Sequence, residues 1–165
     1  SGSSNQPTGV LNTSGIGSVV GGTNGAAPDW ADIVDLESAV AIDNADMGAL
    51  GFLTNAATRG KLLQTEKASG TAQYVWSDSN TLRGYNAAVS NQVPSNGTKG
   101  TGTALSSMVF GNWNDLIIGT WGGIDINVDT STGSASGTIR VVALQDVDIA
   151  VRNAVSFAAM TDIIT

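Results

Sequence analysis

Residues Trp113–Met160 read WNDLIIGTWGGIDINVDTSTGSASGTIRVVALQDVDIAVRNAVSFAAM, and this stretch decides the predicted fold. Its first part contains two short runs of strand-forming residues, Leu116–Ile118 and Ile124–Val128. Gly122 and Gly123 separate the two runs, and a pair of glycines suits the tight turn of a β-hairpin because glycine adopts positive φ without steric cost. We therefore expect two strands joined by a hairpin turn at the glycine pair.

The second part of the stretch predicts one long strand from Thr138 to Arg152, after a Gly- and Ser-rich loop at Thr130–Gly137. Its odd positions are almost all apolar: Ile139, Val141, Ala143, Gln145, Val147, Ile149 and Val151. Its even positions include the charged residues Arg140, Asp146, Asp148 and Arg152. Because side chains alternate between the two faces of a strand, this pattern indicates a strand with one buried face.

Upstream of this stretch, the sequence predicts two helices. The first spans about Pro28–Asn44, where proline in the first turn and three aspartates suit a helix start. Its apolar residues recur at helical spacing: Trp30, Ile33, Leu36 and Val40. The second helix is expected over Asn55–Lys67, with Asn55 as a suitable cap, after a short apolar run at Leu50–Leu53.

Two further strands are expected, at Tyr85–Val89 and Ser107–Phe110. A polar loop at Pro94–Thr103 and a turn at Gly111–Asn114 flank the second of them. Two early helices followed by successive strands predict an α+β (mixed α/β) fold, with a central sheet flanked by helices.

The aromatic residues suggest where surfaces are covered. Tyr74, Val75 and Trp76 lie in an otherwise polar loop, Ala68–Thr81, and need a partner surface either in their own domain or in a neighbouring molecule. Core positions are favoured for Trp30 and Trp121, whereas core and interface are equally favoured for Trp76.

Composition narrows the possible functions. The chain has 165 residues, enough for one compact domain, with no cysteine and no histidine. Disulfides, thiolate metal sites, cysteine nucleophiles and imidazole bases are therefore absent. Seven basic and fourteen acidic residues give a net charge of -7, and the basic residues form no run, which argues against nucleic-acid binding through a basic patch. No segment has the length and hydrophobicity of a membrane span.

The acidic residues near the C-terminus admit several interpretations. Asp146 and Asp148 fall on one side of the long strand and could bind a hard cation together with Asp125 or Asp129, or act as an acid pair in glycoside hydrolysis. A Ca²⁺ site needs more oxygen ligands than spacing places here, and the chain lacks a dense aromatic platform for sugar. We favour a polar strand face whose acids pair with Arg140 and Arg152 or with a neighbouring subunit. No catalytic, cofactor or metal site is expected.

Three phrases resemble the major capsid proteins of tailed phages and prophages. These are FLTNAATRGKLLQTEK at Phe52–Lys67, RGYNAAVSNQVP at Arg83–Pro94, and the Trp113–Met160 stretch with LIIGTWGGIDI and IRVVALQDVDIAV. Their order and spacing together carry the resemblance, which covers most of Val10–Ile163.

The resemblance implies an HK-ninety-seven-type fold with an axial and a peripheral domain. It implies an axial domain at residues 10–142 and a returning peripheral-domain strand at residues 143–165. Independently of the resemblance, the Ser- and Gly-rich start of the sequence suggests a disordered or cloning-derived lead at residues 1–9. The chain would lack the spine helix, extended loop and N-terminal arm of the family. Cross-linking through an Asn on the last long strand is not implied, because Thr138–Val142 contains no Asn.

The function implied by the resemblance is structural. The chain would be a non-enzymatic subunit of an icosahedral shell that assembles in the host cytoplasm into pentamers and hexamers around double-stranded DNA. Its partners would be copies of itself and, in the full-length form, scaffold and portal proteins, without sequence-specific nucleic-acid binding, a membrane or a cofactor. The candidate subunit contacts are Tyr74, Val75, Trp76, Asp146, Asp148 and Arg152. The alternatives are a secreted adhesin or carbohydrate-binding module, and a divergent acid-pair enzyme.

Overall fold

A seven-stranded mixed sheet and a separate two-stranded hairpin organise the computed structural model, which describes residues 6–77 and 79–165. The strands of the sheet run in the order β1-β9-β6-β2-β4-β3, and β5 pairs with β6 beside this path. Their bounds are β1 Gly17–Val19, β2 Leu50–Thr54, β3 Thr81–Leu82, β4 Tyr85–Val89, β5 Gly97–Lys99, β6 Gly102–Asn112 and β9 Phe157–Ile163. The hairpin consists of β7 (Leu116–Asp129) and β8 (Arg140–Val151). Two helices and a mixed sheet confirm the predicted α+β class.

Helix α1 (Trp30–Ile42) forms where the sequence predicts it. The Asp29 side chain accepts a hydrogen bond from the Asp32 N–H, and the Asp32 carboxylate accepts one from the Asp29 N–H, which makes a capping box. Ile33, Leu36 and Val40 are buried, so the apolar stripe of the helix packs on the sheet.

Helix α2 (Ala56–Leu62) is shorter than predicted. Asn55 caps it by accepting a hydrogen bond from the Thr58 N–H, as expected. After Leu62 the backbone pairs with a returning segment instead of continuing as a helix: the Val75 N–H donates to the Thr65 carbonyl at 2.9 Å and the Lys67 N–H to the Gln73 carbonyl at 2.7 Å. These tertiary partners replace the last helical turn.

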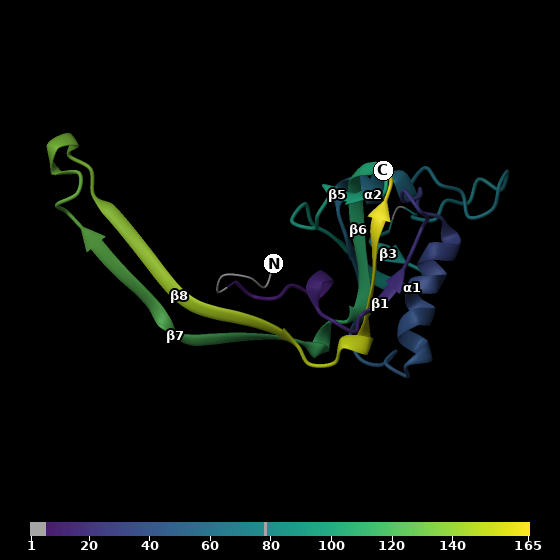
Figure 1. Cartoon of the computed structure of the whole chain (residues 1–165), viewed down its shortest axis with the longest axis horizontal. Coiled ribbons are helices and arrows are strands. Elements are labelled where there is room, and N and C mark those ends of the chain that lie inside the picture. Colours follow the sequence, from purple (N-terminus) through teal and green to yellow (C-terminus); the bar gives the residue numbers. More distant parts are fainter. Residues whose placement is uncertain (1–5, 78) are drawn as a thin grey trace.

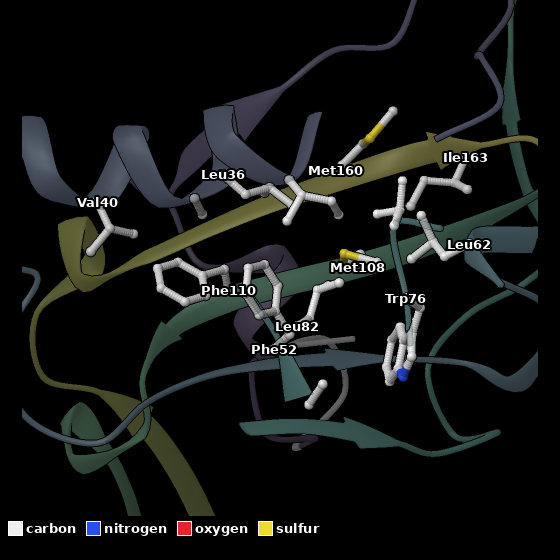
Figure 2. Packing of buried hydrophobic residues seen from close by; sticks show 14 residues of the cluster. Leu36, Val40, Phe52, Leu62, Trp76, Leu82, Met108, Phe110, Met160 and Ile163 are labelled. Carbon is white, nitrogen blue, oxygen red and sulfur yellow. The ribbon is translucent and has the colours of Figure 1, made fainter. Parts of the chain in front are cut away.

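The main core lies between the two helices and one face of the sheet (Figure 2). Alternate residues of β6 and β9, such as Met108, Phe110 and Met160, point into it, and the Phe110 ring lies 4.5 Å from the Phe52 ring between centroids. The other face carries a smaller cluster around Val109, Phe157 and Ala159. This second cluster is covered by partly buried residues of the N-terminal segment and the hairpin base, namely Val10, Leu11, Ile16, Trp113, Leu116 and Val151.

The predicted turn at Gly122 and Gly123 is wrong, because β7 is one continuous strand. Its two halves pair with β8 and not with each other, as the pairs Ile118 with Ile149 and Val128 with Val141 show. The glycines lie at a bulge where four residue steps on β7, from Trp121 to Asp125, oppose two on β8. Gly122 has φ +67°, so the bulge uses the same backbone freedom that suggested a turn.

Three other predicted boundaries change. Strand β6 continues to Asn112, so the turn expected at Gly111–Asn114 is displaced into a short 3-10 helix, η2 (Trp113–Asp115). The loop expected at Pro94–Thr103 contains β5 and the start of β6. The strands at Tyr85–Val89 and around Ser107–Phe110 are confirmed, as is the long strand that is now β8.

The expected domain boundary after residue 142 falls inside β8. Residues 143–165 do not form one returning strand: β8 pairs with β7 in the hairpin, whereas β9 pairs with β6 and β1 inside the main sheet. Of the expected lead at residues 1–9, residues 1–5 lie outside the described part of the chain.

Candidate assembly surfaces

The β7–β8 hairpin extends far from the main sheet and packs on it only at its base (Figure 1). At about 3.3 Å per residue, the 14 residues of β7 give the hairpin a contour length of about 45 Å. Both of its faces are open to solvent, so the half-buried strand predicted from the alternation of β8 is wrong for this chain by itself. The alternation of apolar and polar residues along β8 shows that one face is apolar, but it does not indicate what covers that face.

One side of the hairpin is mostly apolar, interrupted by Thr120 on β7 and Gln145 on β8. Directly opposed residues of an antiparallel pair share a face, so the register assigns the side chains to the two sides. The apolar face consists of Ile118, Ile126 and Val128 from β7 and Val141, Val147 and Ile149 from β8. Ile118 and Ile126 are each 62% exposed. Several exposed β-branched residues gathered on one face make this side a candidate contact surface for another polypeptide.

The opposite side of the hairpin, called the acidic face below, carries four aspartates interspersed with apolar residues such as Ile117 and Leu144, which are 50% and 61% exposed. Register places Asp148 opposite Gly119, Asp146 opposite Trp121, and Asp129 opposite Arg140, and Asp125 lies on the same side. Trp121 is 59% exposed on this acidic face, so its predicted core position is wrong. Trp30, in contrast, is partly buried against the main core, as expected.

The acids of this face do not form a metal centre. No group of three carboxylates with metal-binding geometry occurs in residues 6–77 and 79–165. Asp129 instead holds the loop at the end of the hairpin: hydrogen bonds from Thr132 and Ser131 hold the pKa of Asp129 well below its usual range. This carboxylate is used by its own loop.

The aromatic loop faces its own domain. Trp76 and Val75 are 2% and 3% exposed, and both belong to the main core. The Trp76 indole N–H donates to the Ser79 carbonyl at 3.0 Å, which satisfies its polar atom inside the protein. The prediction of Val75 and Trp76 as subunit contacts is therefore corrected, because the Leu62–Thr65 backbone draws this segment inward. Tyr74 remains exposed and stays a candidate contact.

Arg152, the last candidate contact, forms an ion pair with Asp115 at the base of the hairpin. Asp115 is 4% exposed, and sequence reasoning missed it because it lies in a segment expected to be near a turn. Hydrogen bonds from Ser156 and from the Arg152 guanidinium hold the pKa of Asp115 below its usual value, against the opposing effect of burial. Arg152 therefore does not pair with Asp146 or Asp148, as the sequence had suggested it could.

An apolar hollow lies on the second face of the main sheet. Its lining consists of Ala49, Leu50, Gly51, Phe52, Leu53, Asn86, Ala88 and Trp113. The Trp113 indole N–H already donates to the Gly51 carbonyl at 3.1 Å. The lining offers contact surface and no acid or base. Among the described residues, no helix has the length and hydropathy needed to span a membrane.

Comparison with known proteins agrees with this architecture. The family model described as "Phage capsid family" matches residues 1–162. The major capsid protein of Halomonas phage phiHAP-1 is 33% identical over 157 residues, which are 95% of this chain and 24% of that protein. The chain thus spans about a quarter of that relative's length.

Solved structures share the fold. One described as "Capsid of empty GTA particle computed with C5 symmetry" has a TM-score of 0.66 at 20% identity and covers 96% of this chain and 55% of its own. The structure described as Gordonia phage Cozz has a TM-score of 0.66 at 16% identity, and the match covers 96% of this chain and 52% of that chain. A virus-like particle from Pyrococcus furiosus has a TM-score of 0.59 at 16% identity, and the match covers 92% of this chain and 58% of that chain. These similarities support the HK-ninety-seven-type fold expected from the sequence. The family match over residues 1–162 shows that the chain belongs to the phage capsid family.

Proposed function

We propose that this chain is part of a shell subunit that associates with copies of itself into pentamers and hexamers enclosing double-stranded DNA. The observation that carries the proposal is the hairpin, which presents an apolar face with nothing to cover it within the described chain. A projecting element of this kind gains stability only when another polypeptide covers it. The C5 symmetry named for one structural neighbour supports a ring of subunits.

The covering polypeptide that we propose is the part of the capsid protein that lies outside this chain, in the same subunit. The relative from Halomonas phage is about four times as long as the matched region, which leaves ample chain for this purpose. In this assignment the main sheet is the axial domain, and the hairpin belongs to the peripheral domain. The missing parts would include the spine helix, extended loop and N-terminal arm implied by the resemblance.

The role is structural and not catalytic. Assembly takes place in the host cytoplasm with scaffold and portal proteins as further partners, and the finished location is the virion. The net charge of -7 supports a shell that encloses DNA without sequence-specific binding. Contacts between symmetry-related copies are individually modest, and the shell gains its stability from their number.

A pair of adjacent substitutions tests the role of the apolar face. Ile126→Asp places a carboxylate on the apolar face, and Asn127→Asp places the same charge one residue further on the opposite face. Covering Ile126 contributes about 1.5–3 kcal/mol per subunit, and a buried unpaired carboxylate costs several kcal/mol more.

The assay is sedimentation velocity of the capsid-length gene product that carries this chain. Wild type and Asn127→Asp should sediment as particles or capsomers, whereas Ile126→Asp should sediment as small species. Equal assembly of both variants would show that the apolar face is not covered in the particle. A wild-type protein that remains monomeric would contradict the proposed function itself.

A further inference from the structure

The hairpin is joined to the main sheet by two short connections that run side by side. On one side β6 leads through η2 into β7, and on the other β8 leads through Arg152 and Asn153 into a 3-10 helix, η4 (Ala154–Ser156), and then β9 (Figure 1). The Arg152 N–H donates to the Asp115 carbonyl at 2.8 Å, which closes the base of the hairpin. The direction of the whole hairpin is therefore set within a few residues.

The Asp115 carboxylate lies between these connections and binds both of them. Its Oδ1 accepts hydrogen bonds from Arg152, through Nε at 2.9 Å and through Nη2. Its Oδ2 accepts from Ser156 Oγ at 2.7 Å and from Asn112 Nδ2 at 3.1 Å. One carboxylate thus ties together the end of β6, the exit of β8 and the entry to β9.

Asn112 extends the network to a third segment. Its Oδ1 accepts from the Ala49 N–H at 3.0 Å, just before β2. Gly48 has φ +100°, and a Cβ there would lie 2.6 Å from Asn112 Oδ1, so glycine permits the close approach. Asn112 is therefore fixed by the main sheet, and it transmits that fixed position to Asp115.

The hydrogen-bond network around Asp115 is suited to hold the base of the hairpin rigidly. The carboxylate, Ser156 and Asn112 are all buried, and four donors satisfy the two carboxylate oxygens. Hydrogen bonds to an ionised acceptor are about twice as strong as neutral ones, and such a network polarises its members. Among the described residues, Arg152 supplies the positive charge that pairs with the Asp115 carboxylate.

Because the joint lies at the base of a long hairpin, a small change in its angle moves the hairpin tip a long way. Because the hairpin is about 45 Å long, a turn of about 10° at its base moves its tip by about 8 Å. A displacement of that size would prevent packing against a neighbouring surface, because well-packed interfaces match to within atomic dimensions. The angle at the base therefore decides whether the apolar face meets its cover.

We propose that Asp115 is a positioning residue which, through Arg152, Ser156 and Asn112, fixes the direction in which the hairpin leaves the main sheet. The inference goes beyond the proposed function and does not depend on it, since the joint is a property of this chain alone.

Distance measurement between two spin labels tests the proposal on the chain itself. The sequence contains no cysteine, so Asp43→Cys at the end of α1 and Thr130→Cys at the end of the hairpin provide unique attachment sites, both exposed. Pulsed electron paramagnetic resonance then gives the distribution of distances between body and hairpin. The joint predicts a single narrow distribution for the labelled chain.

Asp115→Asn removes the charge of the carboxylate, and Arg152→Gln removes its partner, whose side chain is 66% exposed and not needed for the core. Both should broaden the distribution or shift it, by at most about 8 Å for each turn of about 10° at the base of the hairpin. Asp146→Asn is the matched control, because it removes one exposed acid from the same hairpin and should leave the distribution unchanged. Circular dichroism confirms that each variant remains folded.

Unchanged distributions in both Asp115→Asn and Arg152→Gln would overturn the proposal, as would equal broadening in Asp146→Asn or a broad distribution in the labelled parent. Where Asp115→Asn does not fold, the result for Arg152→Gln decides. Failure of this experiment leaves the sedimentation test above unaffected, so the two proposals fail separately.

Discussion

Replacing Trp76 by alanine tests whether the aromatic loop belongs to the core of its own domain. Trp76 is 2% exposed, packs in the main core, and donates its indole N–H to the Ser79 carbonyl. Truncating a buried tryptophan to alanine costs about 3–5 kcal/mol, because apolar contacts are lost and a cavity remains. We expect a loss of about 4 kcal/mol in the free energy of unfolding, roughly a thousandfold in the unfolding equilibrium constant.

Guanidinium unfolding followed by far-UV circular dichroism measures this loss on the isolated chain, at several protein concentrations. Tyr74→Ala, two residues away and 46% exposed, is the control and should change stability by about 0.5 kcal/mol or less. A Trp76→Ala variant as stable as the Tyr74→Ala variant would refute the reasoning. It would mean that the tryptophan serves a contact between subunits, as the sequence alone allowed.

Three further predictions concern the main sheet and the helix α1 that packs on it. Gly111→Ala should destabilise the chain by about 1–3 kcal/mol in the same unfolding assay, because a Cβ there would lie 2.5 Å from the Ser156 carbonyl oxygen; unchanged stability would show that β6 and η4 are not in close contact. Asp29→Ala should cost about 1 kcal/mol by removing the cap of α1, and a melting curve identical to wild type would contradict the capping box. Burial tends to raise the pKa of Asp162, but hydrogen bonds from Lys99 Nζ at 2.6 Å and from the Gly21 N–H outweigh it and lower the pKa below the ordinary value of 3.8. The stabilisation is therefore fully present above about pH 4 and lost as pH falls through the lowered pKa, so the stability difference between wild type and Asp162→Asn should shrink on acidification, and a constant difference would exclude this linkage.

Local patterns predicted local structure well. Helix α1 is predictable from sequence because Trp30, Ile33, Leu36 and Val40 repeat at helical spacing after a proline and an aspartate-rich start, and these properties depend only on neighbouring residues. The long strand β8 was found because its alternation extends over many residues. The glycine pair at Gly122 was misread because a bulge and a tight turn need the same positive φ, and only the partner strand distinguishes them.

Properties that depend on distant residues could not be predicted. The short α2 results from competition with a segment that returns ten residues later, which no helix propensity reports. Burial of Trp76 and exposure of Trp121 are set by tertiary position, which the neighbouring residues in the sequence do not determine. The Asp115 joint brings together distant residues: Ser156 lies 41 positions from Asp115, and Arg152 lies 37 positions from it. No pattern along the sequence could have predicted that these residues meet.

The most direct test of the central claim is a cryo-electron microscopy reconstruction of the capsid-length gene product that carries this chain. We expect symmetric rings or closed shells in which the main sheet lies near the symmetry axes, and in which further polypeptide of the same subunit covers Ile118, Ile126 and Val141. A persistent monomer, or particles in which this face of the hairpin remains open to solvent, would contradict it.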